Sequence, residues 1–330
     1  MNVWKDTALL GIYTLTPTHF GTGQTIGAID LPIARDASTD FPVLPATGLK
    51  GVIRDYLGVA NVEKKLLDNL FGKSLEESNE ANALEAGRLA FTEARLVAYP
   101  VRSLNRPFLH VTCRLILERL ARDLRALGRE DFLPAISTLP TDVPEIRVLT
   151  ADSGLANQTL VLEDLVYPAN DITGSSALQD FGKRLAELIP ATEEDTRKRL
   201  IEGLVLIPDQ DFSALMKWVI PVQARIKLTG GKTTDKWRNP ETNAEESGNL
   251  WYEEHLPADC LFIAFVGERR QRTFAQGAHS VNDGYGLTNL TDNAKHLQIV
   301  QLGGNETVGQ GLCYCTLLPS STLGILEAFA

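Results

Sequence analysis

Apolar and polar residues follow two patterns along the first half of this chain, one typical of strands and one typical of helices. Two segments have the composition of strands and end at a proline: Ala8–Thr16 before Pro17, and Arg88–Tyr99 before Pro100. Three segments have the apolar spacing of helices: Gly48–Leu57, Val62–Phe71 (ended by Gly72) and Thr112–Leu127. A short extended piece, Pro42–Leu44, precedes the first helix. The first half therefore predicts a strand, two helices, a strand and a helix.

The second half continues the mixture. Strands are predicted near Ile146–Leu149, Thr159–Tyr167, Pro221–Leu228, Cys260–Val266, Ile299–Leu302 and Leu312–Leu318. Two helices are predicted between Ser176 and Gly203, and Val281–Leu297 has partly helical spacing. Thr229–Asn249 is a long polar stretch without apolar periodicity, which is typical of a functional or mobile loop. This order favours an α+β fold of ferredoxin-like type, built as one elaborated domain with long insertions instead of two domains.

The amino-acid composition agrees with the fold class predicted from these patterns. The chain has 330 residues, of which 44% are hydrophobic and 22% charged, as in ordinary globular proteins. Its four cysteines form no C-x-x-C pair, so we expect reduced thiols and no zinc site. No signal peptide and no membrane-spanning apolar run are recognisable, which predicts a soluble cytoplasmic protein with no membrane partner.

The net charge of −10 argues against a uniformly basic surface that coats nucleic acid. It leaves room for a localised basic groove, because phosphate contact depends on where the charges lie. No P-loop, Ser/His/Asp arrangement or other cofactor motif is present, which disfavours a small-molecule enzyme.

The most informative segment is His19–Arg54. It contains a glycine-rich loop with one acid, Asp30, and then a helix start at which Thr47 has the properties of an N-cap. Lys50 follows in the first turn, so free amides and a lysine together predict a phosphate site. The acid in the same loop indicates chemistry on a phosphodiester. Without further support, the same pattern fits an ordinary surface connection.

Four stretches together resemble the RAMP superfamily, and within it the repeated backbone subunit of type III-B CRISPR effectors. The first is L-L-G-I-Y-T-L-T-P-T-H-F-G-T-G-Q with G-A-I-D-L-P-I and F-P-V-L-P-A-T-G-L-K-G. The second is A-R-L-V-A-Y-P-V-R-S-L, continuing to H-V-T-C-R-L-I-L-E-R-L. The others are L-W-Y-E-E-H-L-P and the C-terminal L-G-G-N-E-T-V-G-Q-G. They occur in the family's order and span both ends and the middle of the chain.

The resemblance implies an RRM-like core with a thumb-like hairpin, spanning residues 1–330 with insertions at about 60–85, 113–145, 170–218 and 229–250. It implies several copies stacked along one guide CRISPR RNA, other effector subunits, and cleavage of paired single-stranded target RNA at regular intervals. The sequence departs from the family pattern at Leu104–Leu109, which leaves guide contact there in question.

The family's catalytic acid corresponds to Asp30, which we expect to act with Mg²⁺ or another divalent cation such as Mn²⁺. His19 could transfer a proton or contact the phosphate, and a structural histidine at the end of the first strand fits equally. Tyr252, Glu253 and Glu254 could complete the site in the family manner. Adjacent side chains in a strand point apart, so we expect at most one of the two glutamates to do so. The other histidines show no metal-ligand spacing.

Guide RNA contacts are expected through phosphates, which position RNA without reading its sequence. The candidate residues are Lys50, Arg54, Arg102, Ser103, Arg106 and the backbone amides of Gly303, Gly304, Gly309 and Gly311. The thumb is expected either at Thr229–Asn249 or at the hairpin near Leu160–Tyr167.

Two alternatives stay open beside the metal-dependent endoribonuclease. One is a non-catalytic RNA-binding scaffold with the same fold, in which another subunit cuts. The other is a guide-processing ribonuclease that uses histidine acid–base catalysis without metal; His19 without a clear partner makes this the weaker one.

Overall fold

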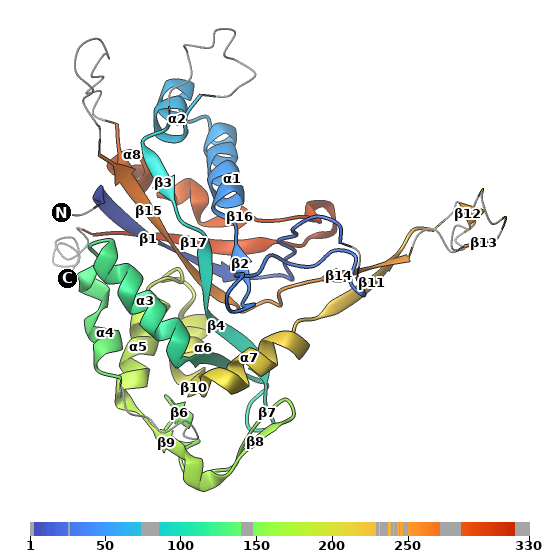
Figure 1. The fold of residues 1–330 in the computed structure, drawn as a ribbon. Coiled ribbons are helices and arrows are strands. Elements are labelled where there is room, and N and C mark those ends of the chain that lie inside the picture. Colours follow the sequence, from blue (N-terminus) through green and yellow to red (C-terminus); the bar gives the residue numbers. More distant parts are fainter. Residues whose placement is uncertain are drawn as a thin grey trace.

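The computed structural model of the chain describes residues 3–25, 27–73, 86–139, 148–228, 250–270 and 285–320, with residues 231, 237–238, 240, 243 and 245–246 between them. One large sheet runs through the described residues in the order β16-β17-β1-β15-β4-β5-β10-β6-β9 (Figure 1). The bounds of its strands are β1 Trp4–Thr14, β4 Ala94–Arg102, β5 Phe108–Cys113, β6 Val148–Thr150, β9 Ile172–Gly174, β10 Leu204–Ile207, β15 Leu261–Arg269, β16 Ile299–Gln301 and β17 Leu312–Pro319. Two short strands, β2 (Val43–Leu44) and β3 (Leu89–Phe91), pair with β4 and β15.

Helices cover both faces of this sheet. Their bounds are α1 Ala46–Val59, α2 Lys64–Phe71, α3 Arg114–Ala126, α4 Pro134–Ser137, α5 Ser176–Ala186, α6 Glu194–Gly203, α7 Asp209–Trp218 and α8 Leu287–Asp292. Strand β1 shows why two layers form: Leu10 and Ile12 join the core with α1, α2 and α7, whereas Leu9 and Tyr13 join the core with α3, α5 and α6. The alternation of strand side chains thus buries β1 on both faces.

Strand β1 is central in the sheet although it comes first in the sequence. It pairs antiparallel with β15, where Leu10 lies opposite Ala264, and with β17, where Leu10 lies opposite Leu317. The strand, glycine-rich loop and strand predicted at the C-terminal end are confirmed as β16 and β17, which pair antiparallel.

A two-stranded arm, β11 (Val222–Ile226) with β14 (Leu250–Glu254), projects from the body and carries β12 (Trp237–Arg238) and β13 (Glu245–Glu246) at its tip (Figure 1). The hairpin of β7 (Leu160–Leu162) and β8 (Leu165–Tyr167) instead lies against the body, and Tyr167 donates a hydrogen bond of 2.9 Å to Asp211 of α7. The projection favours the arm as the thumb, although most of Thr229–Asn249 lies outside the described residues.

The α+β class is confirmed, and the ferredoxin-like detail stays an interpretation. Several local predictions were wrong. The first helix begins after Pro45 without a side-chain cap, so Thr47 lies inside α1 and is not its N-cap. The strand predicted at Arg88–Tyr99 is interrupted between β3 and β4. Strand β4 then continues through Pro100, which was expected to end it, as far as Arg102. Strand β5 occupies the start of the predicted Thr112–Leu127 helix, so α3 begins only at Arg114.

Which residues form each insertion into the core stays a prediction. Within the predicted insertion 170–218, β10 and α7 were not recognised from the sequence. Strand β10 belongs to the main sheet, beside β5. All four cysteines are buried and free, as expected. In the part of the chain that the structure describes, no helix is long and apolar enough to cross a bilayer.

Candidate active site

Asp30 ends the glycine-containing stretch of the loop His19–Ile33, which we call the Asp30 loop. Its Oδ2 accepts a hydrogen bond of 2.8 Å from the backbone amide of Tyr252 in β14. Its carbonyl accepts a bond of 3.0 Å from the amide of Thr25. Oδ1 accepts none from the residues that the structure describes. One oxygen is therefore held by β14, while the other accepts no hydrogen bond from the described part of the chain.

Backbone bonds continue this attachment of the Asp30 loop to β14. The amide of Leu31 donates to the carbonyl of Tyr252 at 3.1 Å, and the amide of Glu254 donates to the carbonyl of Leu31 at 3.0 Å. Asp30 and Tyr252, which were predicted to share a site, thus lie side by side. The contacts are made by the backbone amide and carbonyl of Tyr252, not by its side chain. Tyr252 is 41% exposed.

The two glutamates diverge, as expected for neighbours in a strand. The Glu254 carboxylate points to the Asp30 loop, where it accepts a bond of 3.0 Å from the amide of Ile33 and pairs with Arg35 at 3.0 Å. The Glu253 carboxylate points instead to the loop Leu302–Gly311, which we call the glycine-rich loop, and accepts a bond of 3.0 Å from Asn305. Both side chains are buried, so neither faces the same open space as Asp30.

His19 joins the same arrangement from the end of β1. Its Nδ1 lies 2.7 Å from the carbonyl oxygen of Glu254. A carbonyl can only accept, so Nδ1 carries a proton and donates this bond. Nε2 faces Gly21, where a Cβ would lie 2.5 Å away. His19 is buried, which fits the structural reading from the sequence as well as a role in proton transfer.

The glycine-rich loop packs against His19. The amide of Gly304 donates to the His19 carbonyl at 3.0 Å, that of Gly309 to Glu306 at 2.9 Å, and that of Gly311 to Pro17 at 2.9 Å. The expectation that these three amides are open to phosphate is therefore wrong, because each already has a carbonyl acceptor. Gly303 and the surface of the loop remain predicted RNA contacts.

Positive charge gathers beside α1. Burial lowers the pKa of Lys50, and the charges of Arg269 and Arg54 lower it further, which places three cations close together. Arg54 also binds Asp68 of α2 at 2.8 Å and the carbonyl of Gly72, so part of its charge is neutralised. Arg269 was not predicted as an RNA contact, because it is the last residue of β15 and lies far along the sequence from Lys50 and Arg54. Repulsion among the three cations would be relieved by a phosphate.

The third predicted RNA contact lies at the end of β4. Arg102 is exposed and pairs with Glu163 at 2.6 Å, and Arg106 pairs with Asp152. The Ser103 hydroxyl accepts a bond of 3.2 Å from the amide of Asn105. Arg102 thus contacts the β7–β8 hairpin, Ser103 its own turn and Arg106 the segment after β6, and the RNA contact of all three stays a prediction.

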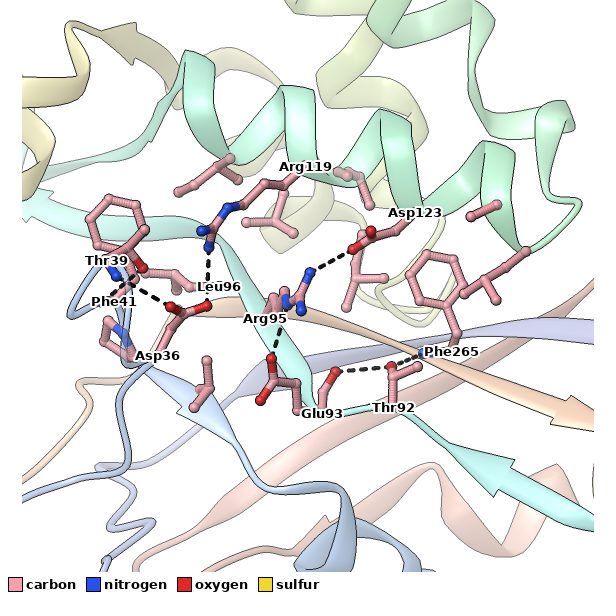
Figure 2. Close-up of a pocket in the computed structure, with 18 residues that line it drawn as sticks. Asp36, Thr39, Phe41, Thr92, Glu93, Arg95, Leu96, Arg119, Asp123 and Phe265 are labelled. Atoms are coloured by element: carbon pink, nitrogen blue, oxygen red, sulfur yellow. Dashed lines mark hydrogen bonds and ion pairs between the residues drawn. The ribbon is translucent and has the colours of Figure 1, made fainter. Parts of the chain in front are cut away.

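A separate cavity of about 230 Å³ lies between α3, β4, β15 and the loop from Asp36 to Val43 (Figure 2). Apolar side chains such as Phe41, Leu96 and Phe265 line it, and Figure 2 shows Arg119 of α3 reaching Asp36. None of the predicted site residues lines this cavity. RNA phosphates bind on open basic surfaces, so this mostly apolar cavity is not a candidate for phosphate contact.

Asp36 provides a prediction for stability against pH. Partial burial raises the pKa of its carboxyl, but hydrogen bonds from Ser38 and the charge of Arg119 outweigh burial and bring the pKa to about 2. A depressed pKa means that Asp36 stabilises the fold above its ordinary pKa of 3.8 and loses this contribution as the pH falls through about 2. We expect Asp36→Asn to lower the free energy of unfolding at neutral pH and to approach the parent protein between those values, as measured by urea unfolding. A difference that does not change with pH would contradict this origin.

A family model described as the RAMP superfamily matches residues 11–314, from β1 to β17. The fold and the loop architecture are therefore those of the RAMP superfamily. The Pyrococcus furiosus protein named CRISPR system Cmr endoribonuclease Cmr4 is 33% identical over 316 residues, which cover 94% of this chain and 95% of that protein. This chain belongs to that superfamily and, within it, to the Cmr4 family, which confirms the resemblance found in the sequence.

Solved structures agree on the fold. The crystal structure of oligomeric Cmr4 from Pyrococcus furiosus matches with a TM-score of 0.64 at 24% identity and covers 96% of this chain and 99% of that chain. The cryo-EM structure of the type III-B Cmr-beta complex bound to cognate target RNA contains a chain that matches with a TM-score of 0.66 at 19% identity, covering 97% and 99%.

Proposed function

We propose that the chain is a guide-RNA-binding backbone subunit of a type III-B CRISPR effector that cleaves the paired target RNA at regular intervals through Asp30. The observation that carries the proposal is Asp30 itself, held by one oxygen on the Tyr252 amide with the other oxygen open. The relative at 33% identity is named an endoribonuclease, and a structural relative comes from a type III-B Cmr-beta complex described as bound to cognate target RNA. Both names support RNA as the substrate.

The partners follow from the same reasoning. The cations Lys50, Arg54 and Arg269 would hold phosphates of the guide, and the β11–β14 arm would act as the thumb. Further copies of the chain would lie along the guide beside other effector subunits, and the name of the oligomeric Cmr4 crystal structure supports self-association. A scaffold without catalytic activity is the second candidate, favoured only if Asp30 proves dispensable.

The donor set suits a divalent ion only together with RNA. Within the described ranges, no three His, Cys, Asp or Glu side chains converge to hold a metal. Mg²⁺ commonly binds through one or two carboxylates plus substrate phosphates, which fits the open Oδ1 of Asp30 beside a scissile phosphate. Such an ion would neutralise charge on the phosphoryl oxygens. The Tyr252 amide would meanwhile keep the Asp30 carboxylate directed toward the phosphate.

Metal removal tests this proposal. We expect the reconstituted guide complex to cut target RNA into regularly spaced products with Mg²⁺ or Mn²⁺, and excess EDTA to abolish the cuts. Restoring the ion should restore them, and gel analysis of end-labelled target gives the spacing. Cleavage that persists in EDTA would instead support histidine acid–base catalysis without metal.

A further inference from the structure

The carboxylate of Glu253 is buried and contacts side chains from three segments of the chain. Its Oε1 accepts a hydrogen bond of 2.6 Å from Nε1 of Trp251. Its Oε2 accepts one of 3.0 Å from Nδ2 of Asn305, lies 2.8 Å from Nε of Arg225, and lies 3.3 Å from Nε2 of His255. We call these five residues the Glu253 cluster. It joins β11, β14 and the glycine-rich loop at one point.

The charge of this carboxylate is consistent with a permanent anchor. Burial raises the pKa of Glu253, but hydrogen bonds from Trp251 and Asn305 and the charge of Arg225 outweigh burial and lower it. His255 adds no positive charge at neutral pH, because burial lowers its pKa despite the neighbouring Glu253. The carboxylate is thus ionised, and both of its oxygens are occupied. The lowered pKa makes this carboxylate a weak base, and its burial keeps it away from the open space that Asp30 faces.

The peptide groups on either side of Glu253 hold the Asp30 loop. The amide of Tyr252 donates to the Asp30 carboxylate, and the amide of Glu254 donates to the carbonyl of Leu31. Any shift of β14 at Glu253 would therefore move the donor that orients Asp30. The other end of the anchor, Asn305, adjoins Gly304, whose amide binds the His19 carbonyl.

We propose that Glu253 is a positioning residue: its carboxylate fixes β14 to the glycine-rich loop through Asn305 and thereby sets the orientation of Asp30. This inference rests on the proposed function, in which Asp30 acts on the target RNA. It replaces the sequence-based expectation that Glu253 is itself a catalytic group.

A charge-swap series tests it. Glu253→Gln places an amide donor against the Asn305 amide, and Asn305→Asp places a second carboxylate against Glu253. The double variant restores one donor and one acceptor across the same gap and keeps the summed charge of the pair. A displacement of about 1 Å at a reacting group costs on the order of 100-fold in rate, so each single variant should slow single-turnover cleavage by about 10- to 100-fold.

Three readouts accompany the rate. Target affinity and the fraction of complex that cuts should stay unchanged in the single variants, because a merely destabilised protein would lose active fraction and not rate. Hydrogen exchange of the Tyr252 amide in the free protein should accelerate in each single variant and slow again in the double variant. Glu194→Gln is the matched control, since Glu194 is exposed at the start of α6, outside the Glu253 cluster and the predicted RNA contacts, and should change neither rate nor exchange.

The outcomes separate cleanly. Recovery of most of the rate in the double variant supports positioning, because a catalytic carboxylate would not be replaced by glutamine. Loss of cleavage in both the single Glu253→Gln and the double variant, with unchanged exchange at Tyr252, overturns the inference. If Asp30→Asn retains full cleavage, the proposed function fails, whereas the exchange results still decide whether Glu253 anchors β14.

Discussion

Asp30→Asn is expected to abolish regularly spaced cleavage of target RNA while target binding stays within about twofold. Asparagine keeps the shape of the side chain and can still accept the 2.8 Å bond from the Tyr252 amide, so the loop should retain its position. The substitution removes only the negative charge of the carboxylate, which is needed both to bind a metal ion and to accept a proton. Loss of a catalytic group of this kind typically costs about 10²- to 10⁴-fold in rate.

The matched control is Asp40→Asn in the turn that follows the Asp30 loop. Asp40 has a φ of 62°, which asparagine tolerates, and its carboxylate only approaches Arg35 at 4.0 Å. Single-turnover cleavage by the two variants should differ clearly, whereas filter binding of target RNA should agree within about twofold. Unchanged cleavage by Asp30→Asn would make this chain a scaffold and assign the cutting to another subunit.

Gly303→Ala is expected to damage both stability and cleavage much more than Gly309→Ala. Both glycines lie in the left-handed region, with φ of 85° and 76°, so alanine at either should cost about 1–2 kcal/mol. A Cβ at Gly303 would also lie 2.3 Å from the carbonyl oxygen of His19, whereas a Cβ at Gly309 meets nothing within 4 Å. Only Gly303→Ala must therefore break the contact between the glycine-rich loop and His19.

Urea unfolding and single-turnover cleavage measure the two effects together. Gly309→Ala should lose stability by the conformational cost alone and cleave within about twofold of the parent protein. Gly303→Ala should unfold at a lower urea concentration still and cleave at least about tenfold more slowly, because the His19 end of the Asp30 loop shifts. Equal losses of stability and of cleavage rate in the two variants would contradict this prediction. They would show that the contact between the added Cβ at Gly303 and the His19 carbonyl is relieved without a cost to either.

Periodicity predicted most elements of the fold, and its failures have local causes. Pro100 was expected to end a strand, yet Pro100 pairs with His110 of β5 while the last residue of β4 that pairs with β15 is Ala98. A missing amide on the unpaired side of a strand removes no ladder bond. Strand β10 was missed because a run of four buried apolar residues directly after a helix has the same appearance as the end of that helix.

The candidate site was only partly accessible to sequence reasoning. Asp30 was assigned through the resemblance, since a glycine loop with one acid fits many surface turns. The Glu253 cluster could not be predicted, because Arg225 and Asn305 come from strands and loops far apart in the chain. No spacing rule links them, and His255, one of the histidines without metal-ligand spacing, received no role although its Nε2 lies 3.3 Å from the Glu253 carboxylate.

The central place of β1 in the sheet has a consequence for biosynthesis. Residues Trp4–Thr14 are synthesised long before their two partner strands, because Ala8 pairs with Val266 and with Pro319. Contacts of such high sequence separation slow folding and keep an apolar segment without its partners during translation. The sheet is therefore completed only after Leu312–Pro319 has been synthesised, and β1 lacks both of its partner strands until the last of them is available.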